Sequence, residues 1–140
     1  MSQIVPLHVA LPDVAADFAT VLDTSARPRL AVLDGAEDAA VVSELPDAAE
    51  WTEDDGSEQV LLLVGGSVTA LTARSSEPDE LAVECASALQ TFVMDERNAA
   101  WPVFRGDGRV AEPAVWDGVP QWVAAGRAVA FGRLSSALAG

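Results

Sequence analysis

The sequence contains no lysine and no tyrosine, and it has only one cysteine and one histidine. A single cysteine excludes an internal disulfide framework, and one cysteine with one histidine cannot supply the ligands of a structural zinc site. Basic residues are also scarce, because eight arginines stand against 22 acidic residues, for a net charge of −14. So acidic a chain is poorly suited to bind nucleic acid or an anionic membrane surface.

Long apolar runs are missing as well. The longest, 60–64, is far shorter than the ~20 residues that span a bilayer. The N-terminus has no basic segment followed by an apolar one, so we expect no signal peptide. These absences predict a cytoplasmic protein with no nucleic-acid or membrane partner, no cofactor and no metal. The arginine-only, alanine-rich composition is typical of a high-GC bacterium.

Half of the residues are hydrophobic, and 140 residues are enough for a single domain, 1–140, with its own core. Alternating apolar positions predict a strand over 4–11, and a short apolar run predicts another over 30–33. The runs 60–64 and 67–72 are joined by two glycines, which predicts a β-hairpin whose first strand is covered on both faces. The segment 36–45 fits either a helix or a strand.

Two helices are predicted, near 13–23 and 78–97. The apolar stripe of the longer helix contains Leu81, Cys85, Ala88, Leu89, Phe92 and Val93, and it leaves out Glu84, Gln90 and Glu96. Short β-like segments over 101–134 predict a C-terminal β meander. The expected fold class is therefore α+β, with a mixed or antiparallel sheet, two main helices and the meander.

The acidic residues are unevenly distributed along the chain. Residues 1–70 carry two arginines and thirteen acids, net −11, whereas residues 71–140 carry six and nine, net −3. We expect the densest stretch to form a docking surface for a basic protein partner, since complementary charge speeds association. Its members are Asp34, Glu37, Asp38, Asp47, Glu50, Glu53, Asp54, Asp55 and Glu58. The alternative is a solvated acidic loop.

Three of the four tryptophans lie in the last third of the chain, beside most of the arginines. Tryptophan and arginine are the residues that interface hot spots favour. A second partner-binding set is therefore predicted, which consists of Trp101, Arg105, Trp116 and Trp122. The alternative is a small aromatic core beneath the meander.

Candidate catalytic residues are few. His8 is the only histidine, and it could act with a carboxylate as the base of a small hydrolase or transferase. However, no serine stands in a glycine-flanked elbow, and no phosphate-binding loop is present. Cys85 lies in an apolar helical stripe, where a cysteine packs as a small hydrophobic residue. We therefore assign no catalytic residue and expect a protein that is not an enzyme.

The segment 85–134 contains Phe92-Val93-x-Asp95-Glu96 at the end of the long helix, followed by Trp101-Pro102-Val103. It resembles small uncharacterised actinobacterial proteins in which such a helix runs into Trp-Pro-x-Cys and a ribbon with cysteine and histidine. Here Val103 or Phe104 stands where the first cysteine would fall, and no cysteine or histidine follows. If the ribbon binds metal in those proteins, this chain cannot do the same. The resemblance implies no function.

The sequence as a whole favours a non-enzymatic acidic protein-interaction module. Such a module would be a component of an assembly, or an immunity-like inhibitor of a basic partner. Two alternatives stay open at this point. One is the small hydrolase or transferase that uses His8 with a carboxylate. The other is a self-assembling structural subunit, a homo-oligomer whose differently charged halves make head-to-tail contacts.

Overall fold

A computed structural model of the chain describes residues 3–22, 24–33, 59–65, 67–73, 77–104, 109–124, 126–134 and 137. The strands are β1 Gln3–Pro6, β2 Arg29–Leu33, β3 Gln59–Val64, β4 Ser67–Leu71, β5 Glu112–Trp116, β6 Val119–Ala124 and β7 Arg127–Ala130. The helices are α1 Leu7–Ala10, α2 Pro12–Phe18, the 3₁₀ turn η1 Thr24–Ala26 and α4 Pro78–Arg97. Strands β1–β4 and β5–β7 form two antiparallel sheets, so the predicted α+β class is confirmed.

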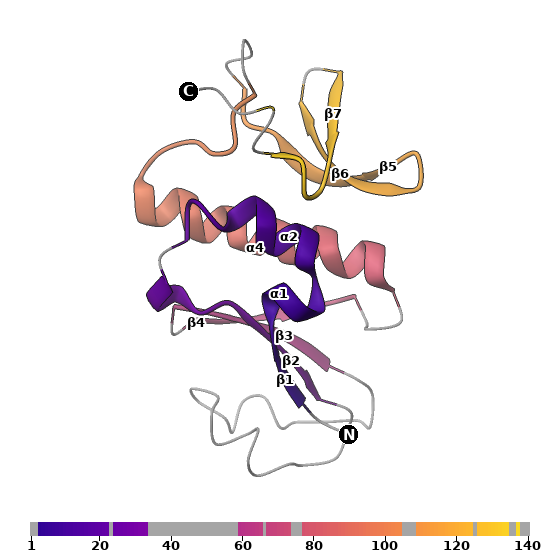
Figure 1. Cartoon of the computed structure of the whole chain (residues 1–140). Helices are drawn as coiled ribbons and strands as arrows, with labels where there is room; N and C mark the ends of the chain where they lie inside the picture. The colour runs from indigo at the N-terminus through magenta and orange to yellow at the C-terminus, as the bar shows by residue number, and fades with distance from the viewer. Residues whose placement is uncertain are drawn as a thin grey trace.

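The helices α2 and α4 lie between the two sheets, with β1–β4 on one side and β5–β7 on the other (Figure 1). Helix α4 contacts strands of both sheets. A helix in such a middle layer needs a wide apolar surface. Adjacent buried residues supply that width, because Leu81 and Ala82 are both buried, as are Cys85 and Ala86, with Leu89 one turn further on.

Strand β3 lies inside its sheet, between β2 and β4. Val60, Leu62 and Val64 join the main core beneath the helices, whereas Leu61 and Leu63 belong to a second buried cluster on the other face. Successive side chains of a strand point to opposite faces, so a strand that is apolar throughout must be buried on both. The predicted hairpin and its doubly covered first strand are therefore confirmed.

The first predicted strand, 4–11, is wrong beyond Pro6. Proline has no N–H to extend a β ladder, and the chain turns there into the single helical turn α1. The Leu7 N–H donates to Pro28 O at 2.9 Å, and the Leu11 N–H donates to Leu7 O at 2.7 Å. Val9, which alternation would have placed inside, is 62% exposed.

The helix predicted at 13–23 ends early, at Phe18. The N–H groups of Val21 and Leu22 both donate to Phe18 O, which closes a turn after the last helical residue. Both side chains still pack against the main core, although they are only partly buried. The helical spacing of Val21 and Leu22 therefore predicted correctly that these side chains pack on the core, but it predicted the end of the helix wrongly.

The predicted C-terminal meander is confirmed as β5–β6–β7, with an additional bridge between Val103 and Val110. Gln90 of α4, expected outside the apolar stripe, is instead buried at the start of this region. Its Nε2 donates to Trp101 O at 3.1 Å and to Ala111 O at 2.7 Å. The amide thus ties the helix to both ends of the loop that leads into β5.

Candidate functional site

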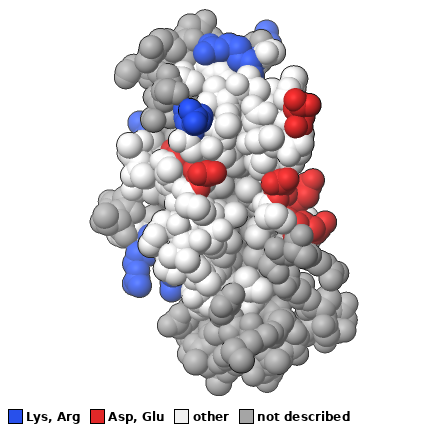
Figure 2. All heavy atoms as spheres, turned by 45° about the vertical axis from the view of Figure 1, so that its right-hand side comes forward, with Lys and Arg blue, Asp and Glu red and all other residues white. Residues whose placement is uncertain are grey.

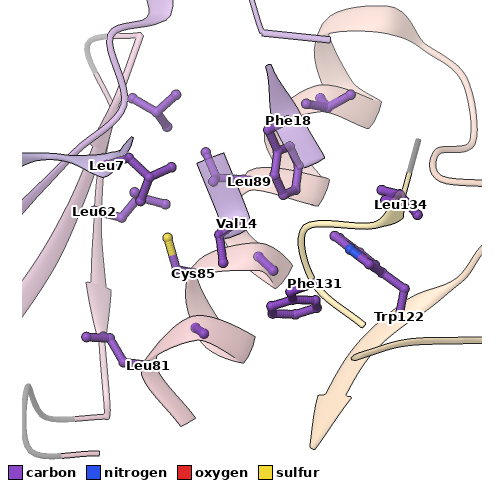
Figure 3. Close-up of a cluster of buried hydrophobic side chains, with 14 of the residues drawn as sticks. Leu7, Val14, Phe18, Leu62, Leu81, Cys85, Leu89, Trp122, Phe131 and Leu134 are labelled. Carbon is purple, nitrogen blue, oxygen red and sulfur yellow. The ribbon is translucent and has the colours of Figure 1, made fainter. Parts of the chain in front are cut away.

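The two predicted partner-binding sets have different outcomes. All nine residues of the acidic set, from Asp34 to Glu58, and Arg105 lie outside the described residues. Trp101 is 7% exposed and Trp122 is fully buried, so the interface interpretation of these two tryptophans is wrong. Both contact Phe18 in an aromatic core, with ring centroids 4.9 Å and 5.8 Å away respectively. Figure 3 shows Trp122 facing α2 and α4.

A buried carboxylate holds this aromatic core in place. Asp17 of α2 accepts hydrogen bonds from Trp122 Nε1 at 2.9 Å, Gly132 N at 2.8 Å and Leu134 N at 3.1 Å. Burial raises the pKa of Asp17, and these three hydrogen bonds oppose that shift without cancelling it. Helix α2 is thereby fixed to residues more than 100 positions away in the chain.

Trp116, the remaining predicted tryptophan, is 49% exposed. It ends β5, and its cross-strand partner Val119 begins β6. Asp117 and Gly118 connect them with φ values of 55° and 77°, the two positive values of a type I′ hairpin turn. Val115 and Val119 are also exposed, by 39% and 46%. We call Val115, Trp116 and Val119 the hairpin tip.

A groove of about 270 Å³ lies beside the hairpin tip. We call it the helix–hairpin groove; its described lining is Leu11, Pro12, Asp13, Val14, Asp79, Ala82, Val119, Pro120, Ala130 and Phe131. The buried side chains of Val14, Ala82 and Phe131 form an apolar floor. Val119 lines the groove and is also the cross-strand partner of Trp116, so the groove and the hairpin tip adjoin at this residue.

The charged side chains of this surface are acidic. Asp13 and Asp79 are exposed and stand in the first turns of α2 and α4, where the helix dipole favours a carboxylate. No basic residue is among the groove's described lining. A Cβ on Gly132 would lie 3.0 Å from Asp13 Oδ1, so glycine leaves room for this carboxylate at the groove. Figure 2 shows both acidic and arginine side chains around a largely uncharged area of the described surface.

His8 is exposed on α1 and lines a different pocket, together with Arg27 and Arg29. The described lining of that pocket includes no serine, cysteine or carboxylate that could act with it. Cys85 is fully buried, and burial raises the pKa of its thiol to about 12, so its predicted packing role is confirmed. Within the described ranges, no cluster of three metal-ligating side chains occurs, and no helix is long and apolar enough to cross a bilayer.

Comparison of the chain with protein-family models, curated proteins and solved structures found no match. The resemblance of 85–134 to small actinobacterial proteins therefore stays a prediction. Sequence reasoning singled out Trp116 but missed Val115, Val119 and the groove. The Asp-Gly pair between apolar neighbours was a signal for the hairpin tip, because such pairs form two-residue hairpin turns that leave their flanks at the surface.

Proposed function

We propose that this protein is a non-enzymatic interaction module that binds a partner segment combining an apolar side chain with a basic one. The supporting observation is Trp116, half-exposed on a tight hairpin beside a groove whose charged side chains are Asp13 and Asp79. An apolar partner side chain fits the groove floor. A neighbouring arginine or lysine can pair with the two carboxylates, and a further side chain of the segment can pack on the indole ring of Trp116.

The backbone of the hairpin tip favours binding without a large ordering cost. The type I′ turn and the β5–β6 ladder hold Trp116, and its carbonyl oxygen accepts a hydrogen bond from Gln121 Nε2 at 2.9 Å. A side chain on a preorganised backbone loses less conformational freedom on binding than one on a long loop. Tryptophan is also the residue most enriched at energetic centres of interfaces.

The net charge of −14 supports a basic partner. Long-range attraction raises the association rate of an oppositely charged partner, and salt weakens it. The acidic set between Asp34 and Glu58, predicted from the sequence, would add to the same attraction. Because the groove is small, the expected ligand is a short segment, which binds with a Kd on the order of micromolar.

Selection of random 12-residue peptides displayed on phage tests the proposal. Peptides are selected on the wild-type protein and counter-selected on Trp116→Ser. We expect the enriched peptides to carry arginine or lysine within two positions of an aliphatic or aromatic residue. Enrichment of neutral or acidic peptides would contradict the proposal, as would equal recovery on the Trp116→Ser variant.

A second copy of the chain is the other occupant to consider for the hairpin tip. Sedimentation equilibrium at low and high salt distinguishes it from a foreign partner. We expect a monomer at both salt concentrations. A dimer that the Trp116→Ser variant loses would show that the tip is covered by self-association, and the partner proposal would then fail.

A further inference from the structure

We propose that a second pocket, formed by α1, α2 and the start of β2, binds a small amphiphilic anion: a free carboxylate on a compact apolar body. We call it the arginine pocket. Its volume is about 350 Å³, at the lower end of the ~300–1,000 Å³ range of small-molecule sites. The residues that matter are Leu7, Phe18 and Leu22 on the apolar side, and His8, Arg27 and Arg29 on the polar side.

The charge of this pocket is opposite to that of the chain around it. Residues 1–70 contain thirteen acids but only two arginines and one histidine. Both arginines and the histidine line the arginine pocket, and none of its described lining residues is acidic. Concentrating both arginines of an acidic half-chain in one concavity makes a local site for an anion.

Arg27 is held in an unusual backbone conformation. Its φ is +43°, a left-handed value that arginine rarely adopts, whereas asparagine and aspartate adopt it more readily. Hydrogen bonds fix the backbone on both sides, from Gly65 N to Ala26 O at 2.8 Å and from Leu7 N to Pro28 O at 2.9 Å. Strain that the surrounding structure maintains at a pocket-lining residue is typical of a functional position.

The chemistry of the lining selects the ligand class. The partly exposed Ala15, Leu22 and Pro28 offer an apolar wall, and the almost completely buried Leu7 and Phe18 lie behind it. A guanidinium donates two parallel hydrogen bonds to a carboxylate, so Arg27 suits a carboxylate at the mouth of the pocket. The helix–hairpin groove carries carboxylates instead, so one ligand would not suit both sites.

Isothermal titration calorimetry with octanoate tests this proposal. Acetate, which lacks the apolar body, and octylammonium, which reverses the charge, are the matched probes. We expect octanoate to bind one to one and the other two to bind at least about tenfold more weakly. Saturation must appear below about 10 mM octanoate. No saturable binding of octanoate, or equal binding of octylammonium, would overturn the proposal.

Variants locate the site. Arg27→Gln should weaken octanoate binding about tenfold or more, since it removes a charged hydrogen-bond donor. Arg109→Gln is the control, because it makes the same charge change at an exposed arginine outside the pocket lining. Ala19→Phe, at an exposed lining position, should block the pocket without removing any charge and answers the question if Arg27→Gln does not fold. Equal weakening by Arg27→Gln and Arg109→Gln, or undiminished binding to Ala19→Phe, would refute the assignment.

Discussion

At the scale of single residues, Asp17 has the most important structural role. A buried carboxylate is costly unless hydrogen bonds replace its water shell. Three N–H donors from the C-terminal region do so here, and two of them share Oδ2. Asp17 therefore joins the helical layer to the sheet that carries the hairpin tip.

Asp17→Asn should lower the free energy of unfolding by about 2–4 kcal/mol at neutral pH. An asparagine has one acceptor oxygen, and its amide group would point N–H donors at the N–H donors of Trp122, Gly132 or Leu134. Urea denaturation measures the change. Asp13→Asn is the matched control in the same helix, and because Asp13 is exposed we expect a change below about 0.5 kcal/mol. Equal effects of the two variants would contradict the role given to Asp17.

Glu84 provides a pH-dependent contact between α4 and the end of β4. Its carboxylate accepts hydrogen bonds from Thr72 N at 3.1 Å, from the Thr72 hydroxyl and from Ala73 N. Desolvation by itself raises the pKa of Glu84, but the hydrogen bonds from Thr72 and Ala73 outweigh it, and the net pKa is lowered. The folded state thus binds this proton more weakly than the unfolded state does.

The pKa directions of Glu84 and Asp17 predict opposite pH profiles. The contribution of Glu84 is present above its unfolded pKa and is lost as pH falls through the lowered folded value. The contribution from the titration of Asp17 is present below its unfolded pKa and is lost as pH rises through the raised folded value. Urea unfolding from about pH 3 to pH 7 measures both. The difference in unfolding free energy between wild type and Glu84→Gln should grow with pH. The same difference between wild type and Asp17→Asn should shrink with pH. Parallel trends for the two variants would contradict these two pKa directions.

At the scale of elements, the β3–β4 and β5–β6 hairpins each have a glycine at positive φ. Gly65 follows β3 with φ +54°, and a Cβ there would lie 2.9 Å from Phe92 Cζ of α4. Gly118 has φ +77° between β5 and β6, and a Cβ there would meet nothing within 4 Å. Substitutions at these two glycines therefore distinguish the cost of a positive φ from the cost of a steric contact with Phe92.

Gly118→Ala should cost about 1 kcal/mol of unfolding free energy, the price of an alanine at positive φ. Gly65→Ala should cost the same amount plus about 1 kcal/mol more, because the phenyl ring of Phe92 must move. Thermal and urea denaturation of both variants measure the difference. Equal destabilisation by the two variants would mean that the Phe92 ring can move aside at no cost. Close packing of Gly65 against α4 would then not limit the residue at this position.

The elements with strong local signals were predictable from the sequence. The β3–β4 hairpin has a run of five apolar residues before two glycines, and α4 has an apolar stripe that continues over more than three turns. The prediction failed at 4–11. The alternation of apolar residues continues past Pro6 there, but the backbone pairing of the strand with β2 ends at Pro6. The prediction also failed at Gln90 because a glutamine reads as a surface residue unless the carbonyl groups that it binds are known.

At the scale of the whole molecule, the described part of the chain carries two concave sites whose charged side chains have opposite sign. The helix–hairpin groove carries Asp13 and Asp79, and the arginine pocket carries Arg27 and Arg29. Neither site follows from the sequence alone. Asp13 and Val119 are separated by more than 100 residues, and they share a groove only because α2 packs against the C-terminal sheet.

We propose that the hairpin tip and the helix–hairpin groove together form one docking surface. The most direct test of this proposal is calorimetric titration of a selected basic–apolar peptide into the wild type, Trp116→Ser, the double variant Asp13→Asn/Asp79→Asn and the control Asp95→Asn/Glu96→Gln. The control removes the same charge from exposed positions near the far end of α4. We predict that Kd rises about tenfold or more in the first two variants and less than about threefold in the control. Equal affinity for all four proteins, or equal loss in the two double variants, would contradict the account.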